Sequence, residues 1–390
     1  MDMKTGEFIA LSACTMMLTA LGIDVMLPAL GDLRAHFGLP ASSTATSNVI
    51  TFFFLGQMAQ IVFGILSDRF GRLFTLRIGF PLYFAGGIAA VFSPSLELML
   101  AARFVAGVGA SAVFMTTIAG VRDRFVGDKM AHTMSLIFTI FLFTPVLAPF
   151  LGLAILSVAS WQAVFLAPPV FAVFVFIWSL RLEESLPQEK RPLIDWPTIR
   201  RSVKGVIRNR VFLRYTLATT LLFSALSSWV ASADRIVGEI FGRPELFAWI
   251  FAGTGLLMSF SSLMNSRLTF RFGAKRTIRG LVLLYTLVAA GLLAITLITT
   301  DPPAMIPFFT AIALLMSINL AIEPNSSALA MEPMGETAGL ASAVYGTIFF
   351  FTGASLGAVI SHLMTVGVLP LAISFVMIGL ASIALVFGDT

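Results

Sequence analysis

The chain has 390 residues, of which 58% are hydrophobic and only 12% are charged, with a mean hydropathy of +0.95 and a formal net charge of +5. A soluble domain carries about 25% charged residues, so this composition excludes a water-soluble globule and indicates that lipid is the main solvent. The single cysteine, Cys14, excludes a disulfide framework within the chain, and the three histidines are too scattered to indicate a metal site.

The hydrophobic residues form long continuous runs, each close to the ~20 residues that cross a ~30 Å hydrocarbon core as a helix. The runs are continuous and not alternating, which excludes a membrane β-barrel. We therefore expect an all-α integral membrane protein with twelve spans, roughly at residues 7–30, 43–67, 73–92, 96–120, 132–156, 162–181, 212–237, 244–267, 276–299, 304–329, 337–361 and 366–387.

The first run contains one acidic residue, Asp24, in the otherwise uncharged segment 8–30. A carboxylate in hydrocarbon costs about 2.5–3.5 kcal/mol or more, so an ionisable residue at this depth points to a function. The alternative is a structural charge that is satisfied by its neighbours, or a helix that ends earlier than the hydropathy suggests.

A charged motif follows the second run, with Gly64, Asp68, Arg69, Gly71 and Arg72 in the order G-x-x-x-D-R-x-G-R. The first glycine allows close helix approach and the second allows a tight turn. Ion pairs and a helix end can hold such a loop closed, so the motif predicts a conformational gate.

Arg103 in the fourth run is the predicted partner of Asp24. Counted from the expected outer ends of their helices, both lie roughly 10 Å deep at 1.5 Å per residue. A movement that separates or exposes such a pair would move a proton on or off the carboxylate, which makes the pair a candidate for proton coupling. The alternative is a static buried pair that only orients the helices.

The fifth and eleventh runs contain residues that weaken or interrupt helices. Pro145, Pro149 and Gly152 lie in the fifth run, and Gly353 and Gly357 lie in the eleventh. Prolines remove helix hydrogen bonds and glycines allow close contact. These residues predict a tightly packed seam between two helical bundles that rock against each other, which we call the interface seam.

Further polar residues inside the runs are candidates for the lining of a substrate cavity. Gln57 is of a type that more often joins two helices, Glu323 could be a second acidic site or an interfacial residue, and Asp234 could pair with its neighbour at the end of its span. The full set is Asn48, Gln57, Asn319, Glu323, Asp234 and Arg235.

The longest polar stretch divides the chain into two halves with similar hydropathy, which predicts two six-helix bundles. We expect them at residues 1–182 and 212–390, joined by a cytoplasmic linker at 183–211. All but four of the 25 lysines and arginines fall on one side of the predicted spans. The positive-inside rule makes that side cytoplasmic, together with both termini.

The gate motif resembles the signature of the major facilitator superfamily, and a weaker copy without the aspartate lies at residues 265–276. The segments 100–110 and 144–152 resemble motifs of this superfamily and of its drug:proton antiporters. The segment 22–29 resembles the first-helix signature of the Bcr/CflA group, and 183–186 and 338–343 also resemble that group. In contrast to the group, Gln162 replaces the usual arginine.

The resemblance implies a proton-driven multidrug exporter of small amphipathic compounds, often antibiotics, in the bacterial inner membrane. Small-molecule substrates and membrane lipids are the expected partners of a monomer, with no nucleic acid, no cofactor and no metal, and with protons as the coupling ion. The alternative is a transporter for one metabolite, such as a siderophore or a nucleobase. The sequence contains neither a catalytic cluster nor an ATP-binding P-loop, so an enzyme and a primary pump are not expected.

Overall fold

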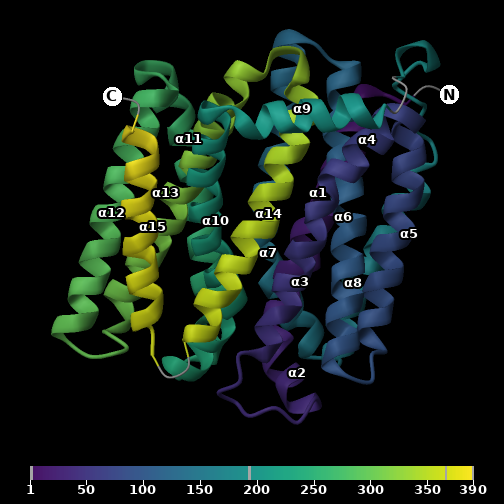
Figure 1. Ribbon diagram of the computed structural model, residues 1–390. Helices are drawn as coiled ribbons and strands as arrows, with labels where there is room; N and C mark the ends of the chain where they lie inside the picture. The colour runs from purple at the N-terminus through teal and green to yellow at the C-terminus, as the bar shows by residue number, and fades with distance from the viewer. Residues whose placement is uncertain (1–2, 192–194, 365–366, 389–390) are drawn as a thin grey trace. The chain divides into compact units, whose positions relative to one another are not determined.

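The computed structural model describes residues 3–191, 195–364 and 367–388, and every regular element in these residues is helical (Figure 1). They include twelve helical stretches that are long and apolar enough to cross a membrane, which confirms the predicted count and the all-α fold. Residue 366, the predicted start of the last span, lies outside the described part. The spans are Thr5–His36, Ala45–Phe70, Arg72–Val91, Leu96–Arg124, His132–Leu156, Trp161–Ser179, Arg210–Ile240, Pro244–Phe272, Ala274–Ile298, Met305–Gly335, Ala338–Leu363 and Leu369–Phe387.

The chain packs into two compact units. The first unit consists of Met1–Ala29 and Phe52–Ser202, and the second of Leu30–Thr51 and Val203–Thr390. The second unit therefore contains a segment that the sequence order places between the first two spans. The predicted division at residues 182 and 212 remains a prediction about the domains.

Two helices of the first unit pack closely because glycines on each face the backbone of the other. On α5 and α6, a Cβ atom at Gly86 would meet the backbone of Ala106, and one at Gly109 would meet the backbone of Tyr83. Small residues let helix backbones come into close van der Waals contact. This contact holds the helices together, because lipid provides no hydrophobic driving force between them. The elements are α1 (Thr5–Asp24), η1 (Leu27–Ala29), η3 (Gln57–Ala59), α4 (Gln60–Phe70), α5 (Arg72–Val91), α6 (Leu96–Arg124), α7 (Gly127–Leu156), α8 (Trp161–Ser179) and η4 (Gln188–Lys190).

The second unit is centred on α10, whose buried residues extend along almost its whole length. It packs against α13, α14 and α15. The elements are α2 (Leu30–His36), η2 (Ala45–Ser47), α10 (Arg210–Arg235), η5 (Ile236–Ile240), η6 (Pro244–Leu246), α11 (Phe247–Phe272), α12 (Ala274–Ile298), α13 (Met305–Met331), η7 (Glu332–Thr337), α14 (Ala338–Leu363) and α15 (Leu369–Phe387). The helix α3 (Asn48–Gly56) begins in this unit and ends in the first one.

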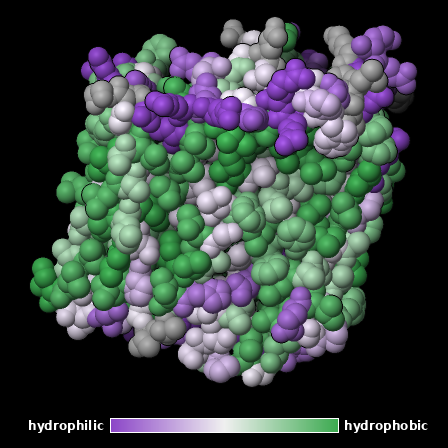
Figure 2. Space-filling view, in the orientation of Figure 1, coloured by the Kyte–Doolittle hydropathy of each residue, from purple (hydrophilic) through white to green (hydrophobic). Residues whose placement is uncertain are grey.

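Large hydrophobic side chains remain exposed along the spans. Phe270 is 95% exposed, and Phe174 and Leu287 are 66% and 69% exposed. Figure 2 shows hydrophobic side chains over the middle of the visible face, whereas hydrophilic ones gather over α9. A surface of this kind suits hydrocarbon, where helices satisfy their own backbone hydrogen bonds.

The linker contains a helix beyond the twelve predicted spans, α9 (Trp196–Arg208). Its cationic residues, which include Arg200 and Lys204, are exposed, whereas Val206 is buried. Apolar residues three or four positions apart at 199, 203 and 206 are the pattern of an amphipathic helix, and this pattern was the signal for α9.

Candidate functional site

Asp24 is the last residue of α1 and is only 6% exposed. The helix ends there because Pro28 has no N–H group and its ring would clash with the carbonyl of the residue four positions earlier, which is Asp24. The chain continues as the short 3-10 helix η1. The carboxylate thus lies at a break in the first span and not within a regular helix.

Arg103, in α6, is 1% exposed and contacts α1 through the main chain. Its Nη2 donates a hydrogen bond of 2.5 Å to the carbonyl oxygen of Gly22, and its guanidinium lies 4.5 Å from the centre of the Phe53 ring. The carbonyl of Gly22 is available because the Met26 N–H, its α-helical partner, instead bonds to Ile23.

The predicted pairing of Asp24 with Arg103 stays a prediction. Arg103 binds the main chain two residues away from Asp24, at the end of α1. Tyr83 of α5 makes a similar contact, with its hydroxyl donating to the carbonyl oxygen of Leu18 at 2.6 Å. Gly22 makes room for this arrangement, since a Cβ there would come within 2.8 Å of the Tyr83 hydroxyl.

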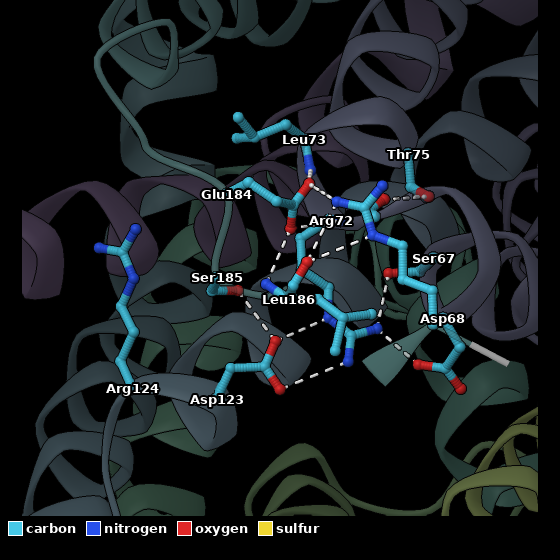
Figure 3. Close-up of polar contacts among 12 residues, drawn as sticks. Ser67, Asp68, Arg72, Leu73, Thr75, Asp123, Arg124, Glu184, Ser185 and Leu186 are labelled. Atoms are coloured by element: carbon cyan, nitrogen blue, oxygen red, sulfur yellow. Dashed lines mark hydrogen bonds and ion pairs between the residues drawn. The ribbon is translucent and has the colours of Figure 1, made fainter. Parts of the chain in front are cut away.

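Two of the predicted gate residues, Asp68 and Arg72, bind each other, and the side chain of Arg72 is 11% exposed (Figure 3). Its Nη1 donates to Asp68 at 2.6 Å and to Ser67 at 3.0 Å, and its Nε donates to Asp123 of α6 at 2.8 Å. Gly71 has a φ of 101°, which favours glycine and allows α5 to begin directly after α4.

The other two gate residues lie on α4. Gly64 is half-buried in the helix, and Arg69 is in its last turn. Asp123 could not be identified from the sequence, because this acidic partner comes from a helix far away along the chain.

The linker also binds the gate, through Glu184. Its carboxylate accepts hydrogen bonds from the N–H groups of Arg72 at 3.0 Å and Leu73 at 3.1 Å, as Figure 3 shows. Arg191 approaches the same carboxylate at 3.6 Å and donates to the Phe70 carbonyl at 3.1 Å. The first turn of α5 is thus capped by an anion, which the helix dipole favours.

Amide and hydroxyl side chains bind one another beside the corresponding loop of the second unit. The Asn325 Nδ2 donates to Asn265 at 2.7 Å, and the Thr269 hydroxyl donates to the Asn325 side chain, also at 2.7 Å. Gly273 again has a positive φ, of 80°. The weaker copy of the motif therefore keeps the turn between α11 and α12 and adds contacts between amide side chains.

The cavity candidates are distributed over both units. In the second unit, Asn319 donates to the carbonyl of Leu222 at 2.6 Å, and Asn48 lies 3.4 Å from His362. In the first unit, Gln57 is 1% exposed. Its amide nitrogen has no hydrogen-bond partner among the described residues.

Glu323 of α13 borders an aromatic stack in the second unit. It lies beside Tyr345 of α14, whose hydroxyl is also next to polar side chains of α10 and α13. The Tyr345 and Phe349 rings stack with centres 5.9 Å apart, and Phe349 stacks on Phe223 at 4.2 Å. This arrangement places an acidic group at the edge of a flat apolar surface.

Asp234 forms an ion pair with Arg34 at 3.1 Å, and its pairing with Arg235 stays a prediction. Arg235 is 2% exposed and lies on the same turn of α10. Neighbouring residues on a helix point in different directions, so adjacent charges rarely face each other. Arg34 was missed because its partner lies 200 positions away in the sequence.

The glycines of the predicted interface seam make their close contacts inside each unit. A Cβ at Gly152 would meet the carbonyl of Val25, and one at Gly357 would meet Ser227 of α10. Gly353 packs against Phe223 in the same way. The helix α7 contains both Pro145 and Pro149. These contacts explain packing within a unit, and the role of the seam between bundles remains a prediction.

A family model described as Major Facilitator Superfamily matches residues 12–358. A curated relative, the uncharacterized MFS-type transporter YdgK of Bacillus subtilis (strain 168), is 29% identical over 392 residues, which cover 98% of this chain and 96% of the relative. The bicyclomycin resistance protein homolog of Haemophilus influenzae is 25% identical and covers 92% and 90%. The multidrug resistance protein MdtL of Shigella flexneri is 30% identical over 65% of each chain.

Solved structures show the same fold. The human organic anion transporter MFSD10 matches with a TM-score of 0.73 and 16% identity, and the match covers 99% of each chain. The xylose transporter XylE from E. coli matches with a TM-score of 0.74 and 12% identity, covering 98% of this chain and 96% of that one. The chain belongs to the Major Facilitator Superfamily and is a multi-pass membrane transporter and not an enzyme.

Proposed function

We propose that this transporter exports small amphipathic compounds, including antibiotics, across the bacterial inner membrane in exchange for protons. The observation that carries the proposal is the buried carboxylate of Asp24 at the break in the first span. Arg103 is bound to the Gly22 carbonyl at this break, and a movement that changes the exposure of Asp24 would move a proton on or off its carboxylate. Different conformations can then favour different protonation states, which is the requirement for coupling.

The aromatic stack beside Glu323 supports an amphipathic cargo. Stacked rings offer a flat apolar surface, and a neighbouring acidic group can orient a polar or cationic part of the substrate. Relatives named for bicyclomycin resistance and for multidrug resistance support export of antibiotics. The excess of lysine and arginine on one side of the spans supports cytoplasmic termini, and we propose a monomer in contact with lipid.

Reconstituted proteoliposomes provide the test, with ethidium and bicyclomycin as probes. An imposed pH gradient should drive uphill movement of a probe, and the probe should in turn dissipate the gradient. Asp24→Asn should abolish uphill movement but leave the protein folded. The matched control is Asp32→Asn, since Asp32 is an exposed carboxylate on α2.

Accumulation of a probe that ignores the gradient would refute antiport, and full activity of the Asp24 variant would remove that residue from the mechanism. A thermal-shift screen of antibiotics, dyes and metabolites on the purified protein then tests the breadth of substrates. Stabilisation by a single metabolite, with no effect of chemically diverse drugs, would favour the dedicated transporter.

A further inference from the structure

A groove of about 870 Å³ opens at one end of the second unit, where the end of α11, the start of α12 and the end of α13 meet. We call it the α12 groove. Its charged lining consists of Lys275, Arg276 and Arg279 of α12 and of Glu332 at the start of η7, beside the apolar ring of Phe272. Three positive charges and one negative charge leave a net charge of +2 on this lining. Basic pockets between transmembrane helices are typical sites for phospholipid head groups.

Arg279 is held at the wall of the groove and keeps a free hydrogen-bond donor. Its Cζ lies 5.2 Å from the centre of the Phe387 ring of α15, a distance at which the ring attracts the cation. Its Nε is buried and has no hydrogen-bond partner among the described residues. A buried donor without a partner costs free energy, so a ligand oxygen that accepts from this guanidinium is favoured. The planar fork of a guanidinium suits phosphate oxygens in particular.

The start of α12 offers main-chain donors beside these side chains. The first N–H groups of a helix have no partner within the helix, and Gly273, the residue before α12, has no side chain that could supply one. The matching turn of the first unit also begins with a glycine of positive φ, and there the Glu184 carboxylate accepts hydrogen bonds from the first two N–H groups of α5. This turn therefore binds an anion in the first unit, and the helix dipole favours an anion beside α12 as well.

An exposed apolar stripe on α12 begins at the groove. Gly280, Leu283 and Leu287 follow Arg276 on the same helix face, because successive members are three or four positions apart. Both leucines are exposed, and nothing lies within 4 Å of a Cβ at Gly280. The stripe is roughly 16 Å long at 1.5 Å per residue, which is about one leaflet of a ~30 Å hydrocarbon core. A phospholipid uses both the charged groove and the stripe, whereas a free phosphate ion uses only the groove.

We propose that the α12 groove binds an anionic phospholipid, with its phosphate at Arg276, Arg279 and the first N–H groups of α12 and an acyl chain along Gly280, Leu283 and Leu287. The phosphate then acts on α12 as the Glu184 carboxylate acts on α5. The net positive lining selects an anionic lipid over a zwitterionic one, and the carboxylate of Glu332 weakens this selection. The site goes beyond the proposed transport function and does not depend on it.

Native mass spectrometry of the purified full chain, titrated with phosphatidylglycerol in detergent, measures the affinity for the first bound lipid. Arg276→Gln should weaken it about fivefold and the double variant Arg276→Gln, Arg279→Gln about 25-fold, since each basic residue contributes a similar factor. Glu332→Gln should strengthen binding, because it removes a repelling charge. The matched control is Arg267→Gln, an exposed arginine of α11 outside the residues that line the groove, which should leave the affinity unchanged.

Hydrogen exchange in nanodiscs locates the bound lipid on the chain. Phosphatidylglycerol in place of phosphatidylcholine should slow amide exchange in the first turn of α12 about tenfold, and this protection should be lost in the double variant. The first turn of α5 should exchange equally in both lipids, because Glu184 already caps it.

Each outcome decides one part of the proposal. An unchanged affinity in the double variant, or an equal loss in Arg267→Gln, would overturn the site. Equal binding of phosphatidylglycerol and phosphatidylcholine would contradict the preference for an anion. Displacement of the lipid by inorganic phosphate at a similar concentration would assign the groove to free phosphate and refute the lipid. None of these measurements uses a proton gradient or a drug, so failure of this site and failure of the proposed transport function are distinguishable.

Discussion

The cap that Glu184 places on α5 is predicted to control local opening at the gate. Glu184→Ala removes the acceptor of the Arg72 and Leu73 N–H groups, which are bonded at 3.0 and 3.1 Å. Glu184→Gln keeps an oxygen acceptor but removes the charge. The two variants therefore separate the hydrogen bonds from the interaction of the carboxylate with the helix dipole.

The expected loss follows from the geometry. A hydrogen bond to a charged group contributes about 1.5–3 kcal/mol, and a charge at a helix end adds about 0.3–1 kcal/mol. The Glu184 side chain is 26% exposed, and the hydrogen-bond and helix-dipole contributions are not additive. We therefore expect the first turn of α5 to lose about 2–3 kcal/mol of stability in Glu184→Ala and about 1 kcal/mol in Glu184→Gln. The larger loss corresponds to local opening about 30–150-fold more frequent.

Hydrogen exchange measured by mass spectrometry reads this opening directly, in peptides that contain the first turn of α5. Faster exchange should be confined to the Arg72 and Leu73 amides and their neighbours. The matched control is Glu183→Gln. Glu183 contacts Arg124 through its main-chain carbonyl, which this substitution leaves in place. Unchanged exchange in Glu184→Ala, or equal acceleration in the control, would refute the cap.

Three more predictions concern packing and charge in the first unit. Gly86→Leu should strongly lower the thermal stability, because a Cβ at this position would meet the backbone of α6. Gly120→Leu should be tolerated, because nothing lies within 4 Å of a Cβ there. Melting curves of both variants in detergent test this prediction. Arg72→Lys should slow transport of the ethidium probe, since one ammonium cannot bind Asp68 and Asp123 in the same way; a wild-type rate would contradict the gate. Tyr83→Phe should cost about 1 kcal/mol of stability, because it removes one buried hydrogen bond to Leu18, and an unchanged melting temperature would argue against that bond.

Features that depend on hydropathy could be predicted from the sequence. A helix that crosses lipid must be apolar along its length, so the twelve spans are visible in the composition itself. The positive φ of Gly71 could be predicted from a local motif, because the tight turn needs a backbone conformation that residues other than glycine rarely adopt. Both kinds of signal are contained within a few neighbouring residues.

Side-chain partners from distant helices could not be predicted in this way. Arg34 and Asp234, or Arg72 and Asp123, are brought together by the packing of helices, and sequence spacing carries no record of it. The main-chain contact of Arg103 could not be predicted for a related reason. Equal depth in the membrane does not fix the rotation of two helices about their axes, and the helix end at Asp24 offered Arg103 a main-chain oxygen instead.

The bond between Glu184 and the start of α5 also has a consequence for biosynthesis. The carboxylate follows the N–H group that it caps by 112 residues. At about 5–20 residues per second, the ribosome needs roughly 6–22 seconds to add that length of chain. During this interval the gate loop has been made but its cap has not, so the nascent helix must enter the membrane with its first turn open. The gate can reach its final form only after the sixth span has been synthesised.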